Sequence, residues 1–170
     1  MTEALVEFFI DLFSGITGSE LGRSITIFIV SMLPIIELRG GLIAAAILKV
    51  SFLKAFIICF IGNILPIPFI LWFIRIVINW MKNIKLFKKF VLWLDKKVEK
   101  KKGQIEKFGF LGIVAFVGIP LPGTGAWTGA LIAAMLDMDK KKSFLACIVG
   151  VFIAGIIMSI ISYGILGNIF

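Results

Sequence analysis

Histidine is absent from this 170-residue sequence, and cysteine occurs only twice. The lack of histidine excludes a histidine-based catalytic triad and a histidine-rich metal site. Cys59 and Cys147 lie in apolar runs without CxxC spacing, so we predict small buried hydrophobic residues, not a redox pair or ligands. Acidic residues are few, 10 against 18 basic ones, and form no carboxylate cluster. We therefore expect no enzymatic activity, no metal and no cofactor.

Apolar residues dominate what is present. They make up 60% of the chain, with a mean hydropathy of +1.09, whereas a soluble domain is about 45–50% apolar. This composition predicts an all-α integral membrane protein, a single domain over residues 1–170 with about four to six membrane segments. The net charge of +8 comes largely from lysines in one segment, which indicates a membrane surface and not nucleic acid as the partner. Residues 1–16 lack the basic start of a signal peptide, so we expect no cleavable signal.

The first part of the chain predicts a surface helix and a hairpin. Acidic residues recur every four positions from residue 3, which predicts an interfacial amphipathic helix within residues 1–20. Residues 24–33 and 40–48 are apolar, but each is too short to cross a bilayer, which takes about 20 residues. The polar turn between them favours a re-entrant hairpin. The alternative is one long kinked helix over residues 24–50.

Spanning helices, a basic segment and a second hairpin are expected after this point. Residues 52–81 can span, with a kink or unwound stretch at Asn63, Pro66 and Pro68. The lysine-rich residues 82–107 predict a basic amphipathic helix on the membrane. Short apolar pieces at 108–118 and 130–136 predict a second hairpin, with a half-helix that starts near Ala126. Residues 143–168 predict a last spanning helix.

The two halves resemble each other. Gly41-Leu42-Ile43-Ala44-Ala45 is similar to Ala130-Leu131-Ile132-Ala133-Ala134. We predict a repeat unit of one hairpin plus one spanning helix, over residues 24–81 and again over 108–170. The odd number of crossings between the hairpins makes the repeats inverted, a pattern typical of transporters. The excess of lysine places the basic linker helix on the cytoplasmic side and both termini outside.

The turn of the first hairpin carries the residues that we expect to bind substrate, namely Glu37, Arg39, Gly40 and Gly41, after the structural Pro34. Arg39 offers planar donors for phosphate or carboxylate. The two glycines would leave the amides of the following half-helix accessible to an anion. Glu37 either neutralises Arg39 in the empty site or carries a coupling proton, because a low-dielectric cavity favours a protonated carboxyl. A purely structural pairing of Glu37 with Arg39 and its own half-helix is the alternative.

The turn of the second hairpin has no charge. The backbone amides and the hydroxyl that we expect to contact substrate are those of Gly123, Thr124 and Gly125. The turn is set by Pro120 and Pro122, and Pro122 is also a predicted binding residue. The half-helix that follows would aim its positive end at the same region. For the neighbouring Trp127, core packing and substrate contact are both open.

The motifs Pro34-x-x-Glu37-Leu38-Arg39-Gly40-Gly41 and Pro120-Leu121-Pro122-x-Thr124-Gly125 together resemble the bacterial and archaeal small multi-drug export protein family, a branch of the DedA superfamily of membrane proteins. The resemblance implies a DedA-like fold with two opposed re-entrant hairpins and a lipid-related activity. DedA proteins carry an acidic residue in the first hairpin, which Glu37 matches. They also carry an arginine in the second hairpin, where this chain has Gly123-Thr124-Gly125.

These expectations lead to one main function and two alternatives. The main one is a proton- or ion-coupled transporter or flippase for an anionic lipid or lipid-phosphate headgroup, for example undecaprenyl phosphate, in the plasma membrane of a prokaryote. The alternatives are a proton-coupled exporter of hydrophobic cations and a membrane scaffold without transport. A homodimer is a further prediction, because small residues on the last helix allow close helix contacts within or between chains: Gly150, Gly155, Gly164 and Gly167.

Overall fold

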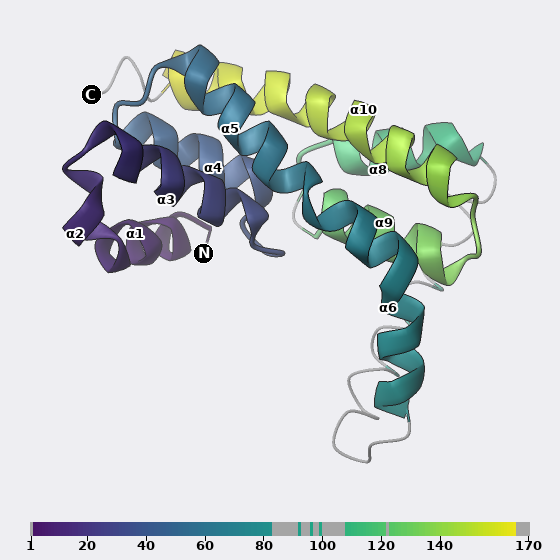
Figure 1. Ribbon diagram of the computed structural model, residues 1–170. Helices are drawn as coiled ribbons and strands as arrows, with labels where there is room; N and C mark the ends of the chain where they lie inside the picture. The colour runs from purple at the N-terminus through teal and green to yellow at the C-terminus, as the bar shows by residue number, and fades with distance from the viewer. Residues whose placement is uncertain are drawn as a thin grey trace.

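The computed structural model describes residues 2–82, 92, 96, 99, 108–121 and 123–165, and all regular structure in these ranges is helical (Figure 1). The predicted basic linker helix over 82–107 lies almost entirely outside them. The helices are α1 (Thr2–Leu12), α2 (Ser14–Thr17), α3 (Glu20–Met32), α4 (Glu37–Ile47), α5 (Phe52–Ile64), α6 (Pro66–Lys82), α8 (Phe110–Gly118), α9 (Ala126–Met135), α10 (Lys140–Ser159) and the π-helix η1 (Ile160–Ile165).

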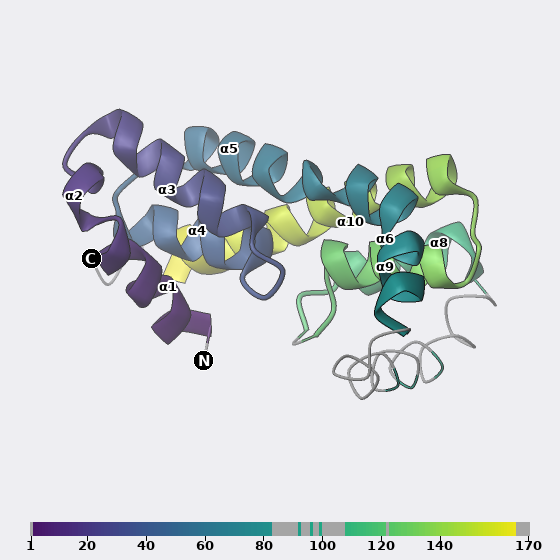
Figure 2. The same ribbon diagram turned by 60° about the horizontal axis from the view of Figure 1, so that its bottom comes forward.

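Two helical hairpins, α3–α4 and α8–α9, form the centre of the molecule. The Ser19 side chain caps α3 by accepting a hydrogen bond from Gly22 N, and extended backbone at Leu33 ends the helix. The alternative of one long helix over residues 24–50 is wrong, because α3 and α4 fold back side by side (Figures 1 and 2). α3 has 13 residues, about 20 Å of helix against a hydrocarbon core of about 30 Å.

The hairpins lie end to end with their turns facing each other, and α10 runs along both, while α5 lies along the first and α6 packs against α9 of the second (Figure 2). α5 packs against α3, and α10 packs against α8. Glycines allow both contacts, since a Cβ atom at Gly62 would lie 2.8 Å from Phe28 O, and one at Gly150 would lie 3.1 Å from Val114 O. Gly155 likewise packs within the chain, against Phe56, while Gly167 lies outside the described residues.

A break separates α5 from α6 at Leu65, as the sequence predicts. Pro66 has no N–H to donate to the carbonyl four residues earlier, so one hydrogen bond of a continuous helix is missing. Even with this break, Phe52–Ile74 and Lys140–Gly164 are the two stretches, in the described ranges, that are long and apolar enough to cross a membrane. The expected four to six segments thus become two helices of spanning length and two hairpins of shorter helices.

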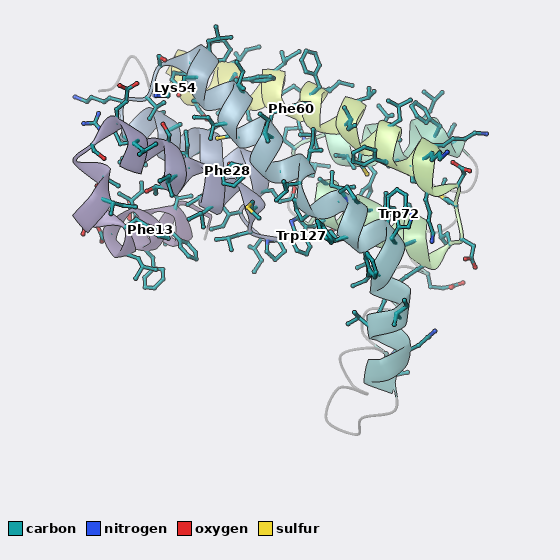
Figure 3. All side chains as sticks on the ribbon, in the orientation of Figure 1. Phe13, Phe28, Lys54, Phe60, Trp72 and Trp127 are labelled. Atoms are coloured by element: carbon teal, nitrogen blue, oxygen red, sulfur yellow. The ribbon has the colours of Figure 1, made fainter. Side chains whose placement is uncertain are left out.

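The long helices expose an unusually apolar surface. Many large hydrophobic side chains of α5, α6 and α10 are at least 40% exposed, including Leu53, Phe73 and Phe152. A soluble monomer rarely exposes such a continuous patch. Figure 3 labels Trp72, one of these exposed side chains, on α6. The distribution fits an all-helical protein surrounded by lipid.

The predicted N-terminal helix is present as α1, and it packs partly against the rest of the protein. α1 packs against α4 through Val6, which is fully buried beside Gly40. Phe8 and Leu12, large apolar residues of the same helix, are exposed. The one-turn helix α2 lies between α1 and α3, within the segment 1–20 for which the sequence predicts a single amphipathic helix.

The second helices of the two hairpins end in the same way. Lys49 follows α4 with φ 53° and Asp137 follows α9 with φ 55°, 88 residues apart. Val50 N donates to Ala45 O at 2.9 Å, and Met138 N donates to Ala133 O at 3.0 Å, again 88 residues apart. This spacing is within one residue of the offset between the two similar segments of the sequence, which is 89 residues from Gly41 to Ala130.

Replacing Gly150 by alanine is expected to destabilise the protein by about 1–3 kcal/mol, because the contact with α8 leaves no room for a methyl group. The added Cβ would lie 2.6 Å from Val117 Cβ. Thermal unfolding in detergent measures the loss. The control is Gly15→Ala in α2, where nothing lies within 4 Å of the added Cβ. Equal unfolding temperatures for the two variants would contradict the close contact.

Candidate functional site

The first turn, residues 33–36, exposes Pro34 and Ile35 and leads into α4 at Glu37. Glu37 has a positive φ of 54°, which is uncommon for a residue other than glycine. Gly40 and Gly41 lie inside α4 and are buried, so the expectation that they open the turn and expose amides is corrected. A Cβ at Gly41 would be 1.9 Å from Ser31 Oγ. The glycines serve close packing.

The second turn, residues 119–125, is shaped by a threonine and two glycines. Thr124 Oγ lies 2.7 Å from Leu121 O and 2.9 Å from Ile119 O, so its hydroxyl donates back into the turn. Gly123 and Gly125 have φ values of 79° and 139°, a range that favours glycine. Pro120 follows Ile119, whose backbone is extended, whereas Pro122 lies outside the described residues. α9 then begins at Ala126, as predicted.

Glu37 connects the two hairpins. Its carboxylate accepts a hydrogen bond from Ala126 N through Oε2 and another from Trp127 N through Oε1, both at 3.2 Å. The side chain is only 5% exposed. It therefore places a carboxylate at the N-terminus of α9, where the free amides and the helix dipole favour negative charge. The predicted anion site at this helix end is filled by the protein's own carboxylate.

Arg39 also reaches across to the second turn. Its Nη1 donates to Leu121 O at 2.6 Å, and its Nη2 donates to Thr124 Oγ at 3.0 Å and to Ile119 O at 3.3 Å. The guanidinium is half-buried. In the part of the chain that the structure describes, Arg39 and Glu37 form no ion pair within 4.0 Å. The expected direct neutralisation is replaced by separate contacts of each charge with the opposite turn.

Trp127 returns a hydrogen bond in the other direction. Its Nε1 donates to Met32 O at the end of α3, at 3.0 Å. Arg39 and Trp127 are 88 residues apart, and both lie in the first turn of their helices, α4 and α9. Arg39 donates to carbonyl groups just after the end of α8. Trp127 donates to the carbonyl group of the last residue of α3. The sequence left the role of Trp127 open, because packing and hydrogen bonding of an indole look alike in a sequence.

A small cavity lies behind the junction of the turns. It has room for about one water molecule, about 10 Å³. Asn63 of α5 lines it, whereas Pro66 and Pro68, which the sequence placed in the same break, do not. No three His, Cys, Asp or Glu side chains of the described residues gather into a possible metal site. The lining residues are Glu37, Leu38, Arg39, Asn63, Val117, Ala126, Val151 and Ala154.

Comparison with known proteins identifies the family. No curated protein and no solved structure matches the sequence. Residues 37–157, well over half of the chain, match a known family, and this segment contains every residue of the junction described above except the first turn and the end of α3. Together with the two apolar spans, the match indicates a membrane location. The chain belongs to the family described as "Putative small multi-drug export protein".

Proposed function

We propose that this protein is a proton-coupled membrane transporter whose substrate is an amphiphile with an anionic headgroup, such as a lipid phosphate like undecaprenyl phosphate. One observation carries the proposal: a buried carboxylate, that of Glu37, occupies the amides at the start of α9. A pair of backbone N–H groups at a helix N-terminus binds phosphate and carboxylate by the same geometry. Glu37 thus stands where a substrate headgroup would bind.

Protonation of Glu37 is the coupling step in this proposal. When a carboxylate oxygen of Glu37 takes up a proton, its negative charge is lost and its hold on Ala126 N and Trp127 N weakens. A phosphate group can then take the two amides, with the half-buried Arg39 as a further donor. Loss of the proton restores the Glu37 carboxylate, which displaces the anion. Proton and headgroup therefore alternate at one helix end.

The transport proposal includes an architecture. Two re-entrant hairpins form an inverted repeat of the DedA type, with both turns near the middle of the membrane. Support comes from the 88-residue spacing of the helix ends and from the reciprocal contacts of Arg39 and Trp127. The lysine-rich linker is cytoplasmic in this proposal, in the plasma membrane of a prokaryote, and the protein is a homodimer. A map of cysteine accessibility that finds the N-terminus in the cytoplasm would overturn this topology.

Arg39→Ala is expected to lower the transport of labelled polyprenyl phosphate in liposomes at least about 10-fold, because a charge-assisted hydrogen bond contributes about 1.5–3 kcal/mol. Arg39→Lys should be intermediate, since lysine keeps the charge without the planar fork. The matched control is Arg23→Ala. Arg23 also donates to two backbone carbonyls, Thr17 O and Leu48 O, but at the open end of the first hairpin. Wild-type transport by Arg39→Ala would show that the assigned role is wrong.

Export of hydrophobic cations is the second candidate, and the family description favours it. In that case Glu37 alone would bind the substrate, and Arg39 would repel it. The same liposomes distinguish the two functions when a quaternary ammonium dye replaces the lipid. Competition between dye and protons that disappears in Glu37→Gln would support cation export. A scaffold role predicts that these variants change stability and that the protein transports neither compound.

A further inference from the structure

The side chain of Asn63 has an unusual position. It is 3% exposed, and its Oδ1 has no hydrogen-bond partner in the protein. A buried acceptor without a partner costs about 1–3 kcal/mol, and such groups are rare in native proteins. Asn63 lines the same small cavity as Glu37 and Arg39. The cavity that holds the proposed proton-binding carboxylate of Glu37 is therefore also lined by a residue whose oxygen receives no hydrogen bond.

The surrounding groups supply no donor for Asn63. An ionised carboxylate only accepts hydrogen bonds, so Glu37 competes with Asn63 for donors. The guanidinium of Arg39 donates to the carbonyls and the threonine of the second turn, and Ala126 N donates to Glu37. The other lining side chains are aliphatic. Two acceptors, the Glu37 carboxylate and Asn63 Oδ1, therefore border the cavity, and the donors of Arg39 and Ala126 N are already bonded to other groups.

One water molecule matches this space in size and chemistry. The cavity volume of about 10 Å³ is close to the minimum that holds a single water. A water has two O–H donors, one for each acceptor. A metal cation fits less well, because the guanidinium of Arg39 would repel it and the remaining walls are apolar.

We propose that Asn63 and Glu37 share one buried water molecule, and that this water passes the coupling proton to and from Glu37. The water donates one O–H to Asn63 Oδ1 and the other to the Glu37 carboxylate. When a proton arrives, it moves from the water to Glu37, and the water regains a proton from the entry path. Asn63 is thus a positioning residue. The inference rests on the proposed function only in that Glu37 takes up a proton.

Asn63 also affects the pH at which Glu37 is protonated. Within the described residues, Arg39 on the same helix and the buried thiol of Cys147 on α10 interact electrostatically with Glu37, while α8 and α9 carry no ionisable side chain. The water adds a neutral donor that stabilises the ionised carboxylate. Its removal should therefore make Glu37 take up its proton at a higher pH.

Infrared difference spectroscopy of the reconstituted protein during acidification tests this inference without any transport measurement. The wild type should show a water O–H band that shifts when H₂¹⁸O replaces water, together with the carboxyl band of Glu37. Asn63→Leu, which fills the cavity with methyl groups, should lose the water band and move the carboxyl midpoint up by about one pH unit, the value of one hydrogen bond. Asn63→Ser keeps space and a polar oxygen, so it should keep the water band. Glu37→Gln identifies the carboxyl band by removing it.

The outcomes separate this inference from the proposed function. An isotope-sensitive water band that persists in Asn63→Leu, or no such band in the wild type, overturns the shared water. If Asn63→Leu does not fold, Asn63→Ser still tests the contact, because replacing the amide acceptor by a hydroxyl should shift the frequency of the water band, and an unshifted band would overturn the shared water. If the water band behaves as expected but no lipid is transported, the proposed function fails and the water site remains.

Discussion

Glu37→Gln is expected to abolish the dependence of transport on a pH gradient. Glutamine cannot exchange a proton near neutral pH, and its NH₂ group would face one of the two amides that the carboxylate now accepts from. Losing hydrogen bonds to a charged acceptor should also lower the free energy of unfolding by about 1.5–3 kcal/mol. Flux of labelled lipid into liposomes, measured with and without an imposed pH gradient, checks the first effect. Thermal unfolding checks the second.

Glu20→Gln is the control for this substitution. Glu20 is an exposed carboxylate at the start of α3 that pairs with Lys54, far from the junction of the turns. Its replacement removes one negative charge from the same hairpin but should leave the pH dependence of transport intact. Transport by Glu37→Gln that still follows the pH gradient would eliminate Glu37 as the coupling residue.

Gly125→Ala should have the largest effect on stability, about 3 kcal/mol or more. The φ of 139° and ψ of −178° at Gly125 belong to a region essentially restricted to glycine, where strain costs about 1–3 kcal/mol. In addition, the new Cβ would lie 2.0 Å from Glu37 Oε2. The Glu37 carboxylate would have to leave α9, and the contact between the hairpins would open. Thermal unfolding in detergent and lipid flux measure both consequences.

Gly123→Ala provides the matched comparison within the same turn. Gly123 also has a positive φ, 79°, but nothing lies within 4 Å of its added Cβ. This variant should lose only the cost of backbone strain, about 1 kcal/mol, and should transport normally. If the two glycine variants behave alike, the contact of Gly125 with Glu37 has no special importance.

The described conformation is closed to a headgroup. A cavity with space for about one water cannot hold a phosphate group. Ile35, Ile119 and Leu121 cover the tips of the two turns with exposed apolar side chains. Substrate can reach the amides of α9 only if the turns separate, which requires the contacts of Glu37, Arg39 and the opposite turn to break. The proposed protonation of Glu37 weakens the most buried of these contacts.

The sequence by itself determined the order of the elements. Two short apolar pieces around Pro34 predicted a hairpin, Pro66 predicted the break in the first long helix, and the half-helix was expected to start near Ala126. The structure contains a helical hairpin at this place, the break before Pro66 and the start of α9 at Ala126. These features depend on local chemistry: the length of an apolar run, the missing N–H of proline and the backbone freedom of glycine.

The partners of the site residues were decided only by the tertiary structure. Sequence proximity suggested that Glu37 and Arg39 pair, but residues two apart on a helix point to different sides, and each finds its partner 80 or more residues away. Gly40 and Gly41 looked like turn residues, yet they pack α4 against its neighbours. Asn63 gave no sign that its oxygen would lack a partner. Such properties depend on which surfaces meet when the two hairpins come together, and no local pattern records that.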